Sequence, residues 1–230
     1  GKTLEWNQEK AGSVGKMNLD GIQEAITALE GILSDKENAQ RAKKWINEAY
    51  SNSASYAEFT NSLVNRIFSK YGLVTLNPDH KDLKASFASV MKKELLEQSS
   101  APLVQQTQST IEALGYKTQA FARDINLFYL QQGSRERIEL DNGEYKILNT
   151  ALTFTEEEIL SELDNHPERF SPNVIMRPMY QETILPNLAY IGGGGELAYW
   201  IERKSQFAEF GVFFPILIRR ASAMLITGGN

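Results

Sequence analysis

The sequence predicts an α/β fold in which helices pack on a largely parallel sheet. Two observations favour it. A short apolar, strand-like run at residues 188–191 leads through four glycines into helix formers that begin at Glu196. Residues 55–95 follow the order helix, strand, polar turn and helix, which is typical of a parallel-sheet unit. With 42% hydrophobic content, 230 residues can bury a sizeable core.

The first 120 residues predict a helical segment followed by an α/β unit. Apolar residues recur at three- and four-residue spacing over residues 19–32, and a second helix is expected at 38–49, so residues 1–54 form the helical segment. Ser55 and Glu58 have the spacing of a capping box, and Gly72 ends the helix that they begin. A strand at 73–76, a helix over 83–95 and a helix over 100–114 complete the unit, residues 55–120.

The second half predicts antiparallel hairpins followed by a return to the parallel core. Strand-like runs at 126–130, 135–140 and 144–148 flank the Asn142-Gly143 turn, so residues 121–172 have the pattern of an insertion. Thr155 and Glu158 repeat the capping box. Residues 173–230 are then expected to hold a short helix at 180–185 and strands at 188–191, 212–218 and 221–226.

The glycine run is the leading candidate for a binding site. Glycine reaches backbone angles that a β-carbon forbids, so Gly192, Gly193, Gly194 and Gly195 are expected to expose amide N–H groups at the carboxyl end of the strand. The alternative is a tight turn with nothing bound. The run is not a standard nucleotide motif, because Leu197 stands at the third glycine position of G-x-G-x-x-G and no G-K-[ST] follows.

Charged side chains flank the glycine run. Glu196 falls in the first helical turn, where a carboxylate would favour a ligand with an ammonium group, or would only complement the helix dipole. Arg177 could clamp a carboxylate or phosphate with its planar fork, or form a salt bridge with Glu182. Gln181 and Glu182 precede the same strand and join Arg177 as candidate substrate-binding residues.

Weaker candidates lie elsewhere. Asn77 and Asp79 follow a predicted strand, where open α/β sheets bind ligands, although helix capping explains Asp79 equally well. Arg123, Arg135 and Arg137 surround the first hairpin and could meet carboxylates, but charges on an exposed strand are usually solvated. The two histidines, His80 and His166, have no companions at ligand spacing, so no metal site is expected.

Charge and composition limit the classes of partner and site that this chain can have. The 24 Lys and Arg against 29 Asp and Glu give a net charge of −5, which offers no broad attraction to nucleic acid or anionic lipid. The longest apolar run near the end, residues 210–218, is far below the roughly 20 residues that span a bilayer. The absence of cysteine excludes disulfides, thiolate nucleophiles and cysteine-bound zinc within this chain. A cytoplasmic location is expected.

Two long stretches carry a resemblance to a known family. RPMYQETILPNLAYIGGGGELAYW at 177–200 and ARDINLFYLQQGSRERIE at 122–139 closely resemble the bacillithiol biosynthesis cysteine-adding enzyme family, BshC, with looser similarity at 12–15, 71–73 and 214–217. The resemblance implies a Rossmann-like parallel sheet core similar to class I aminoacyl-tRNA synthetases. It also implies that residues 121–172 are a connecting-peptide insertion, and that the whole protein carries a coiled coil.

The resemblance also implies a function. The chain is expected to be an internal fragment, inactive alone, of a ligase that adds cysteine to glucosaminyl malate in the last step of bacillithiol biosynthesis. ATP would activate the cysteine carboxylate for amide formation. Independently of the resemblance, the charge of Glu196 suggests that it would hold the cysteine α-amine. The full-length protein is expected to be a homodimer without nucleic-acid or membrane partners. The alternatives are a sugar-nucleotide-dependent transferase and a non-catalytic binding or assembly module.

Overall fold

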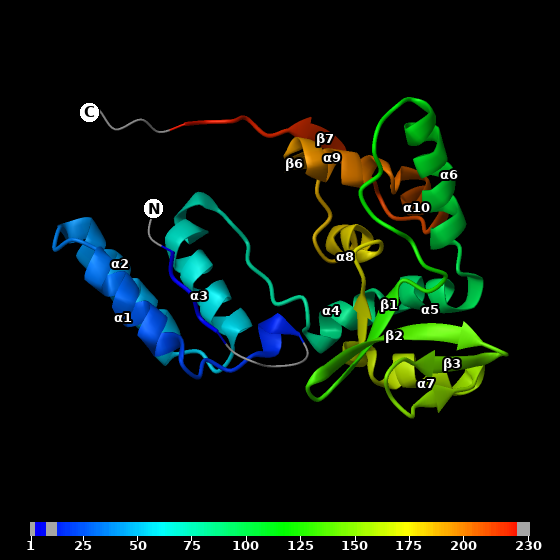
Figure 1. Cartoon of the computed structure of the whole chain (residues 1–230), viewed down its shortest axis with the longest axis horizontal. Helices are drawn as coiled ribbons and strands as arrows, with labels where there is room; N and C mark the ends of the chain where they lie inside the picture. The colour runs from blue at the N-terminus through cyan, green and yellow to red at the C-terminus, as the bar shows by residue number, and fades with distance from the viewer. Residues whose placement is uncertain (1–2, 8–12, 225–230) are drawn as a thin grey trace. The chain divides into compact units, whose positions relative to one another are not determined.

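The computed structural model describes residues 3–7 and 13–224 (Figure 1). The chain divides into two compact units. Unit 1 comprises Gly1–His80 and Leu130–Arg135, and unit 2 comprises Lys81–Tyr129 and Glu136–Asn230. This division differs from the four segments that the sequence suggests. The main boundary falls after His80, and only residues 130–135, at the tip of a hairpin, belong again to unit 1.

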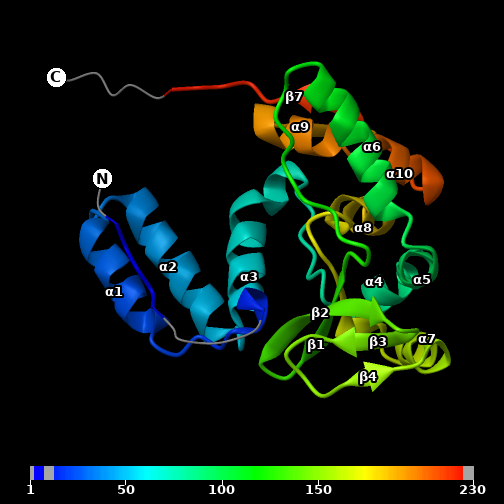
Figure 2. The same ribbon diagram turned by 45° about the vertical axis from the view of Figure 1, so that its right-hand side comes forward.

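Unit 1 is helical. Its elements are η1 (Val14–Lys16), α1 (Ile22–Ile32), α2 (Glu37–Ser51), α3 (Tyr56–Phe68) and η2 (Ser69–Tyr71). Helices α1 and α2 lie side by side in both views (Figures 1 and 2). A small core of Ile22, Ile26 and Ile46 joins them, and Leu63 of α3 packs against it. The helices lie close to the predicted positions because their apolar spacing is local information.

The start of α3 differs in detail from a reciprocal capping box. The Ser55 hydroxyl accepts the Glu58 N–H (3.3 Å), as predicted. The Glu58 carboxylate, however, accepts the N–H of Ala54 (2.8 Å) rather than that of Ser55. The end of the helical segment follows the prediction, since Gly72 takes a left-handed φ of 78°.

The predicted strand at residues 73–76 is wrong. The segment has no regular secondary structure, and it leaves Leu73 and Val74 47% and 61% exposed. The Thr75 hydroxyl donates to the Asn61 side chain (3.2 Å). A strand needs a neighbour for its backbone N–H and C=O groups, and no strand among the described residues pairs with this segment.

From residue 81 onward the chain combines helices with two sheets. The helices and 3-10 turn are α4 (Lys81–Ser86), α5 (Ala88–Glu97), α6 (Ser100–Ala113), α7 (Glu156–Asn165), η3 (Pro167–Arg169), α8 (Arg177–Ile184), α9 (Gly194–Ile201) and α10 (Lys204–Glu209). The strands are β1 (Leu127–Gln131), β2 (Ser134–Asp141), β3 (Glu144–Ile147), β4 (Thr153–Phe154), β5 (Phe170–Pro172), β6 (Ala189–Gly192) and β7 (Ile216–Arg219).

The first sheet has five strands in the order β4-β3-β2-β1-β5. The pairs β1–β5, β2–β3 and β3–β4 are antiparallel. Asn142 and Gly143 connect β2 to β3 with φ of 52° and 83°, the positive values that the Asn-Gly pair predicts. Helix α7 lies against β3 and β4 (Figure 2) and begins with the complete Thr155–Glu158 capping box.

A buried polar network connects this sheet to the helices. The Glu94 carboxylate of α5 accepts the backbone and side-chain N–H groups of Asn126 (3.0 and 2.8 Å) and the Ser100 hydroxyl (2.5 Å). Ser100 in turn accepts the Gln206 amide of α10 (2.7 Å). Burial raises the pKa of Glu94 although these donors oppose the shift. The network fixes α5, α6 and α10 around the start of β1.

The second sheet is the parallel pair β6 and β7, joined through α9 and α10. Strand β6 lies within one residue of its prediction. Strand β7 is shorter than predicted, and residues 221–224 form no strand, while 225 and 226 lie outside the described residues. The ladder ends after the Arg220 N–H donates to Gly192 O (2.8 Å), because β6 turns into α9 there and offers no further partner.

Candidate functional site

In the glycine turn between β6 and α9, the first glycines are needed because there is little room for a β-carbon, and not because of unusual backbone angles. None of the four glycines has a positive φ, so that expectation is wrong. A β-carbon on Gly192 would lie 2.8 Å from the Tyr190 ring and 3.1 Å from the Leu197 side chain. At Gly193 it would lie 3.2 Å from the Arg220 guanidinium. The first two glycines therefore allow β6, α9 and the chain after β7 to approach closely.

The last two glycines leave the start of α9 open. Gly194 and Gly195 are exposed, and an added β-carbon would meet nothing within 4 Å. The first helical hydrogen bond runs from Leu197 N–H to Gly193 O (3.0 Å). The amide N–H groups of Gly194 and Gly195, in the first turn, have no acceptor among the described residues. Donors of this kind attract a carboxylate or phosphate.

Glu196 and Arg220 flank these amides. Glu196 Oε2 accepts the Gly193 N–H (2.6 Å) and lies 3.9 Å from Arg220 Nη1. The Glu196 side chain therefore caps its own helix, yet it remains 51% exposed. Arg220 was not predicted as a site residue. Its signal in the sequence is a pair of arginines directly after an apolar strand, at the edge where parallel strands end together.

Helix α8 carries the other predicted substrate residues. Arg177 is exposed and donates to the Gln181 side chain (3.2 Å), so its partner is Gln181 rather than Glu182. Gln181 donates to Glu182 (3.2 Å). Glu182 is buried and accepts the backbone and side-chain N–H groups of Asn187 (2.9 and 3.1 Å). Glu182 therefore shapes the loop that leads into β6, whereas Arg177 is free to reach a ligand.

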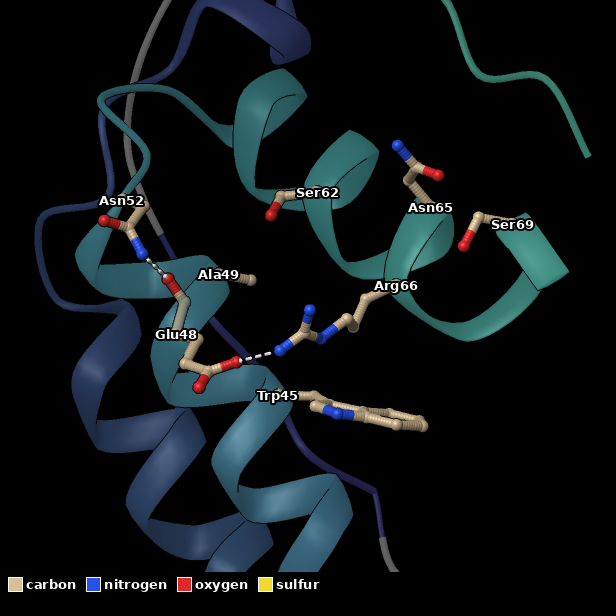
Figure 3. Close-up of a pocket in the computed structure, with 8 residues that line it drawn as sticks. All are labelled: Trp45, Glu48, Ala49, Asn52, Ser62, Asn65, Arg66 and Ser69. Carbon is tan, nitrogen blue, oxygen red and sulfur yellow. Dashed lines mark hydrogen bonds and ion pairs between the residues drawn. The ribbon is translucent and has the colours of Figure 1, made fainter.

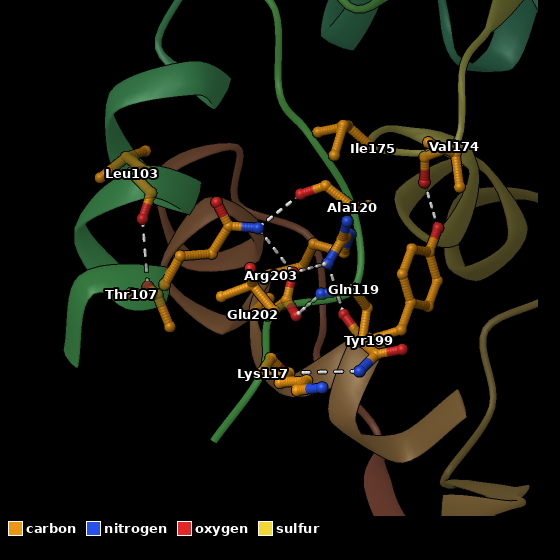
Figure 4. Close-up of polar contacts among 12 residues, drawn as sticks. Leu103, Thr107, Lys117, Gln119, Ala120, Val174, Ile175, Tyr199, Glu202 and Arg203 are labelled. Atoms are coloured by element: carbon orange, nitrogen blue, oxygen red, sulfur yellow. Dashed lines mark hydrogen bonds and ion pairs between the residues drawn. The ribbon is translucent and has the colours of Figure 1, made fainter. Parts of the chain in front are cut away.

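Tyr199 connects α9 to the segment before α8 (Figure 4). Its hydroxyl donates to the Val174 carbonyl, and the Arg203 guanidinium lies 3.9 Å from its ring centroid. Burial raises the pKa of Tyr199, while the charges of Arg203 and Arg177 oppose the shift. Arg177 of α8 therefore acts electrostatically on Tyr199 of α9.

A buried ion pair holds the other end of α9 (Figure 4). Arg203 donates to Tyr199 O (2.5 Å) and to the Glu202 carboxylate (3.1 Å). Glu202 also accepts the Gln119 N–H (2.7 Å) and the Gln108 amide (2.9 Å). Burial lowers the pKa of Arg203, whose Nε and Nη2 have no partner among the described residues. Sequence reasoning missed this pair, because a Glu-Arg-Lys run usually indicates a solvated helix end.

The weaker candidates are dispersed. Within unit 1, the Asn77 side chain accepts the Asp79 N–H (3.0 Å), which forms a local turn. Burial lowers the pKa of Arg135 and the Asp79 charge opposes the shift, so these two side chains are near each other. Arg123 lies over the Phe121 ring at 5.6 Å, and Arg137 is exposed. Neither Arg123 nor Arg137 contacts the glycine turn in the described part of unit 2.

Two observations concern ligands and membranes. Over residues 3–7 and 13–224, no group of three or more His, Asp or Glu side chains is arranged to hold a metal ion. In the same part of the chain, no helix combines the length and the apolar character needed to cross a bilayer. At the glycine turn itself, the described residues supply main-chain donors, the Glu196 carboxylate and the Arg220 guanidinium.

Comparison with known proteins identifies the family. Residues 1–221 match the family described as "Bacillithiol biosynthesis BshC, N-terminal Rossmann-like domain". The proteins named "Putative cysteine ligase BshC" from Flavobacterium johnsoniae and Flavobacterium psychrophilum are 44% and 46% identical over 227 and 226 residues. These matches cover 99% and 98% of this chain but 42% of each relative, so the chain spans less than half of their length.

The match covers both sequence stretches that suggested the resemblance, and it confirms the α/β, Rossmann-like fold class. It extends through the glycine turn, helix α9 and strand β7. The antiparallel hairpins are present in the structure, while their role as a connecting peptide stays a prediction. The chain belongs to the BshC family of bacillithiol biosynthesis and corresponds to its N-terminal Rossmann-like domain.

Proposed function

We propose that this chain is part of a ligase that adds cysteine to glucosaminyl malate, the last step of bacillithiol biosynthesis. Membership of the BshC family supports the reaction, and cysteine ligase is the activity in the names of the relatives. The observation that carries the proposal is the pair of uncovered amide N–H groups at Gly194 and Gly195, placed at the carboxyl end of a parallel strand beside Glu196.

The glycine turn suits the zwitterion of an amino acid. The carboxylate of cysteine would accept the free N–H groups of Gly194 and Gly195. Its ammonium group would pair with the Glu196 carboxylate, which is half exposed. The Oε2 atom of this carboxylate also lies 3.9 Å from Arg220 Nη1. A phosphate fits this end of α9 less well, because Glu196 would repel it. Arg177, exposed near α9, would meet a carboxylate of the malate group.

ATP enters the proposal only through the family. The glycine turn lacks a G-K-[ST] sequence, and Glu196 stands among its free donors, so the described residues form no fitted phosphate site. The sugar amine would form a C–N bond to the cysteine carbonyl carbon while the C–O bond to the oxygen that ATP activates breaks, and the amine would lose a proton to give the amide. Arg123 and Arg137, in unit 2, remain secondary candidates for contacts with the carboxylates of glucosaminyl malate. Asn77, Asp79 and Arg135, in unit 1, remain secondary candidates for polar ligand contacts of that unit alone.

The wider context is part of the same proposal. The substrates are small molecules, and the chain needs neither nucleic acid nor a membrane for this reaction. We place the reaction in the cytoplasm and expect the full-length protein to act as a homodimer. Because the chain spans 42% of its relatives, we expect this chain alone to bind cysteine without forming the amide product.

Calorimetry with a charge-neutralised variant tests the cysteine site. Glu196→Gln keeps a capping side chain at the third helical position but removes the negative charge. We expect cysteine affinity to fall about tenfold, because an exposed ammonium–carboxylate contact contributes on the order of 1 kcal/mol. ATP binding should not change. Equal loss of both ligands, or of neither, contradicts the assignment.

A matched control and a product assay complete the test. Glu158→Gln makes the same change at the third position of α7 and should leave cysteine binding unchanged. Mass spectrometry of cysteine, glucosaminyl malate and ATP incubated with the full-length protein should show the amide product, reduced by Arg177→Ala and Glu196→Gln. Binding of a uridine sugar nucleotide without amide formation would favour the transferase, and no binding of any of these compounds would favour a non-catalytic module.

A further inference from the structure

A polar cleft opens between helices α2 and α3 of unit 1 (Figure 3). Its volume is about 530 Å³, within the range of small-molecule sites. Helices α2 and α3 contribute three residues each, and one residue directly after each helix completes the lining. The lining residues are Trp45, Glu48, Ala49, Asn52, Ser62, Asn65, Arg66 and Ser69.

The α3 side of the cleft is a continuous polar stripe. Ser62, Asn65, Arg66 and Ser69 follow the spacing i, i+3, i+4 and i+7, which places them on one face of the chain. The neighbouring Leu63 packs against the core of unit 1, so this polar face points away from it. Among the described residues, the side chains of Ser62, Asn65 and Ser69 make no hydrogen bond.

The α2 side supplies an aromatic ring with an unused donor. Trp45 extends from α2 toward α3 in Figure 3 and is half-buried. The Arg41 guanidinium lies over the ring, 5.6 Å from its centroid. The indole N–H has no acceptor within the described part of the chain, so this donor is available to a ligand.

Charge in the cleft is balanced. Glu48 and Arg66 face each other across it, and their carboxylate oxygen and guanidinium nitrogen lie 2.7 Å apart. Asn52 donates to the Glu48 carbonyl (2.7 Å), and its amide oxygen points away from α3. The lining therefore offers neutral donors and acceptors around one aromatic surface, with no net charge to select an ion.

We propose that this cleft binds a neutral, hydroxyl-rich sugar ring. Such a ring has one C–H-rich face, which matches the carbon surface of Trp45, and a rim of hydroxyls that both donate and accept. Asn65, Ser62 and Ser69 can do the same, and the Trp45 N–H adds a donor. A purely apolar ligand would leave these groups unpaired, and the two charges of the lining, Glu48 and Arg66, are already paired with each other. The proposal uses unit 1 alone and is independent of the proposed ligase function.

Saturation-transfer NMR with methyl α-D-glucopyranoside on the full chain tests the proposal. We expect the ring protons to receive saturation, and the fluorescence of Trp45 to change with sugar concentration. Asn65→Ala should weaken binding about 3- to 10-fold, which corresponds to one or two neutral hydrogen bonds. Trp45→Ala should weaken it at least about tenfold.

Controls separate the cleft from unspecific effects. Gln105→Ala and Tyr116→Ala remove an exposed amide and an exposed aromatic ring in unit 2, and both should leave binding unchanged. Asn65 is exposed, so its variant should keep the helical circular dichroism of the wild type even if Trp45→Ala does not fold. No saturation transfer to the glucoside, or equal loss in the cleft and control variants, would overturn the proposal.

Discussion

At the scale of single residues, neighbouring glycines in one turn serve different purposes. Gly192 is required because a side chain there would collide with the Tyr190 ring at 2.8 Å. Gly195, three residues later, meets nothing and lies within a helix, where glycine is a poor helix former. Packing therefore does not require glycine at this position, and its amide remains an uncovered main-chain donor.

The two positions should therefore respond oppositely to alanine. Gly192→Ala is expected to destabilise the protein by about 1–3 kcal/mol, because the added methyl group overpacks the turn. Gly195→Ala is expected to stabilise it by about 0.5–1 kcal/mol through helix propensity. Chemical denaturation measures both. A similar loss at the two positions would mean that the start of α9 is more crowded than the structure shows.

Glu94 should make stability depend on pH. Burial raises its folded-state pKa above the ordinary value of 4.5, so the folded protein holds this proton more tightly than the unfolded chain. This contribution is fully present below pH 4.5 and is lost as the pH rises through the raised pKa. The difference in unfolding free energy between wild type and Glu94→Gln should change over that window and be constant outside it. A constant difference throughout would contradict the raised pKa.

At the scale of elements, the capping box of α7 gives a direct test. Thr155 accepts the Glu158 N–H (3.2 Å), and Glu158 accepts the Thr155 N–H (2.8 Å). Thr155→Ala should destabilise the protein by about 1 kcal/mol, because it leaves a first-turn donor without a partner. Thr110→Ala makes the same change at an exposed position in the last turn of α6 and should stay within about 0.5 kcal/mol. Equal losses of unfolding free energy for the two variants in denaturation experiments would show that the Thr155 side chain does not stabilise α7 as a cap.

Elements defined by local chemistry could be predicted from the sequence. The Thr155 cap, the Asn142-Gly143 turn and the Gly72 helix end each depend on a few adjacent residues, and each lies where the pattern predicts it. The strand expected at 73–76 and the full length expected for β7 depend on a partner strand. Backbone pairing is not encoded locally, and this is why those two predictions failed.

The candidate site shows the same limit. The glycine turn and the first-turn position of Glu196 follow from a short stretch of sequence. Arg220 reaches Glu196 only because β7 pairs with β6, and Arg203 is buried only because α9 packs between distant segments. Neither could be inferred from spacing. Glu182 shows a further contact that spacing did not reveal. The sequence predicts a ligand contact for it, and in the structure its carboxylate accepts the Asn187 N–H.

At the scale of the whole molecule, the two units have separate hydrophobic cores. Ile26 lies in the core of unit 1, and Leu163 lies in the large core of unit 2. Each unit should therefore unfold in its own calorimetric transition. Ile26→Ala should lower only one midpoint and Leu163→Ala only the other, each through a loss of about 2–4 kcal/mol. A single transition that shifts with both variants would show that the units unfold cooperatively.

The pairing of β6 with β7 makes the local charge depend on strand alignment. Gly192 lies opposite Arg219, and the next amide, that of Arg220, donates to Gly192 O (2.8 Å). Deleting one residue from the connection before Ile216 would slide β7 along β6 and bring Ala221 to that amide position. Glu196 would then lose its neighbouring cation without any change at either charged residue. The length of the connection before β7 thus decides which residue lies beside Glu196, and with it the charge at the glycine turn.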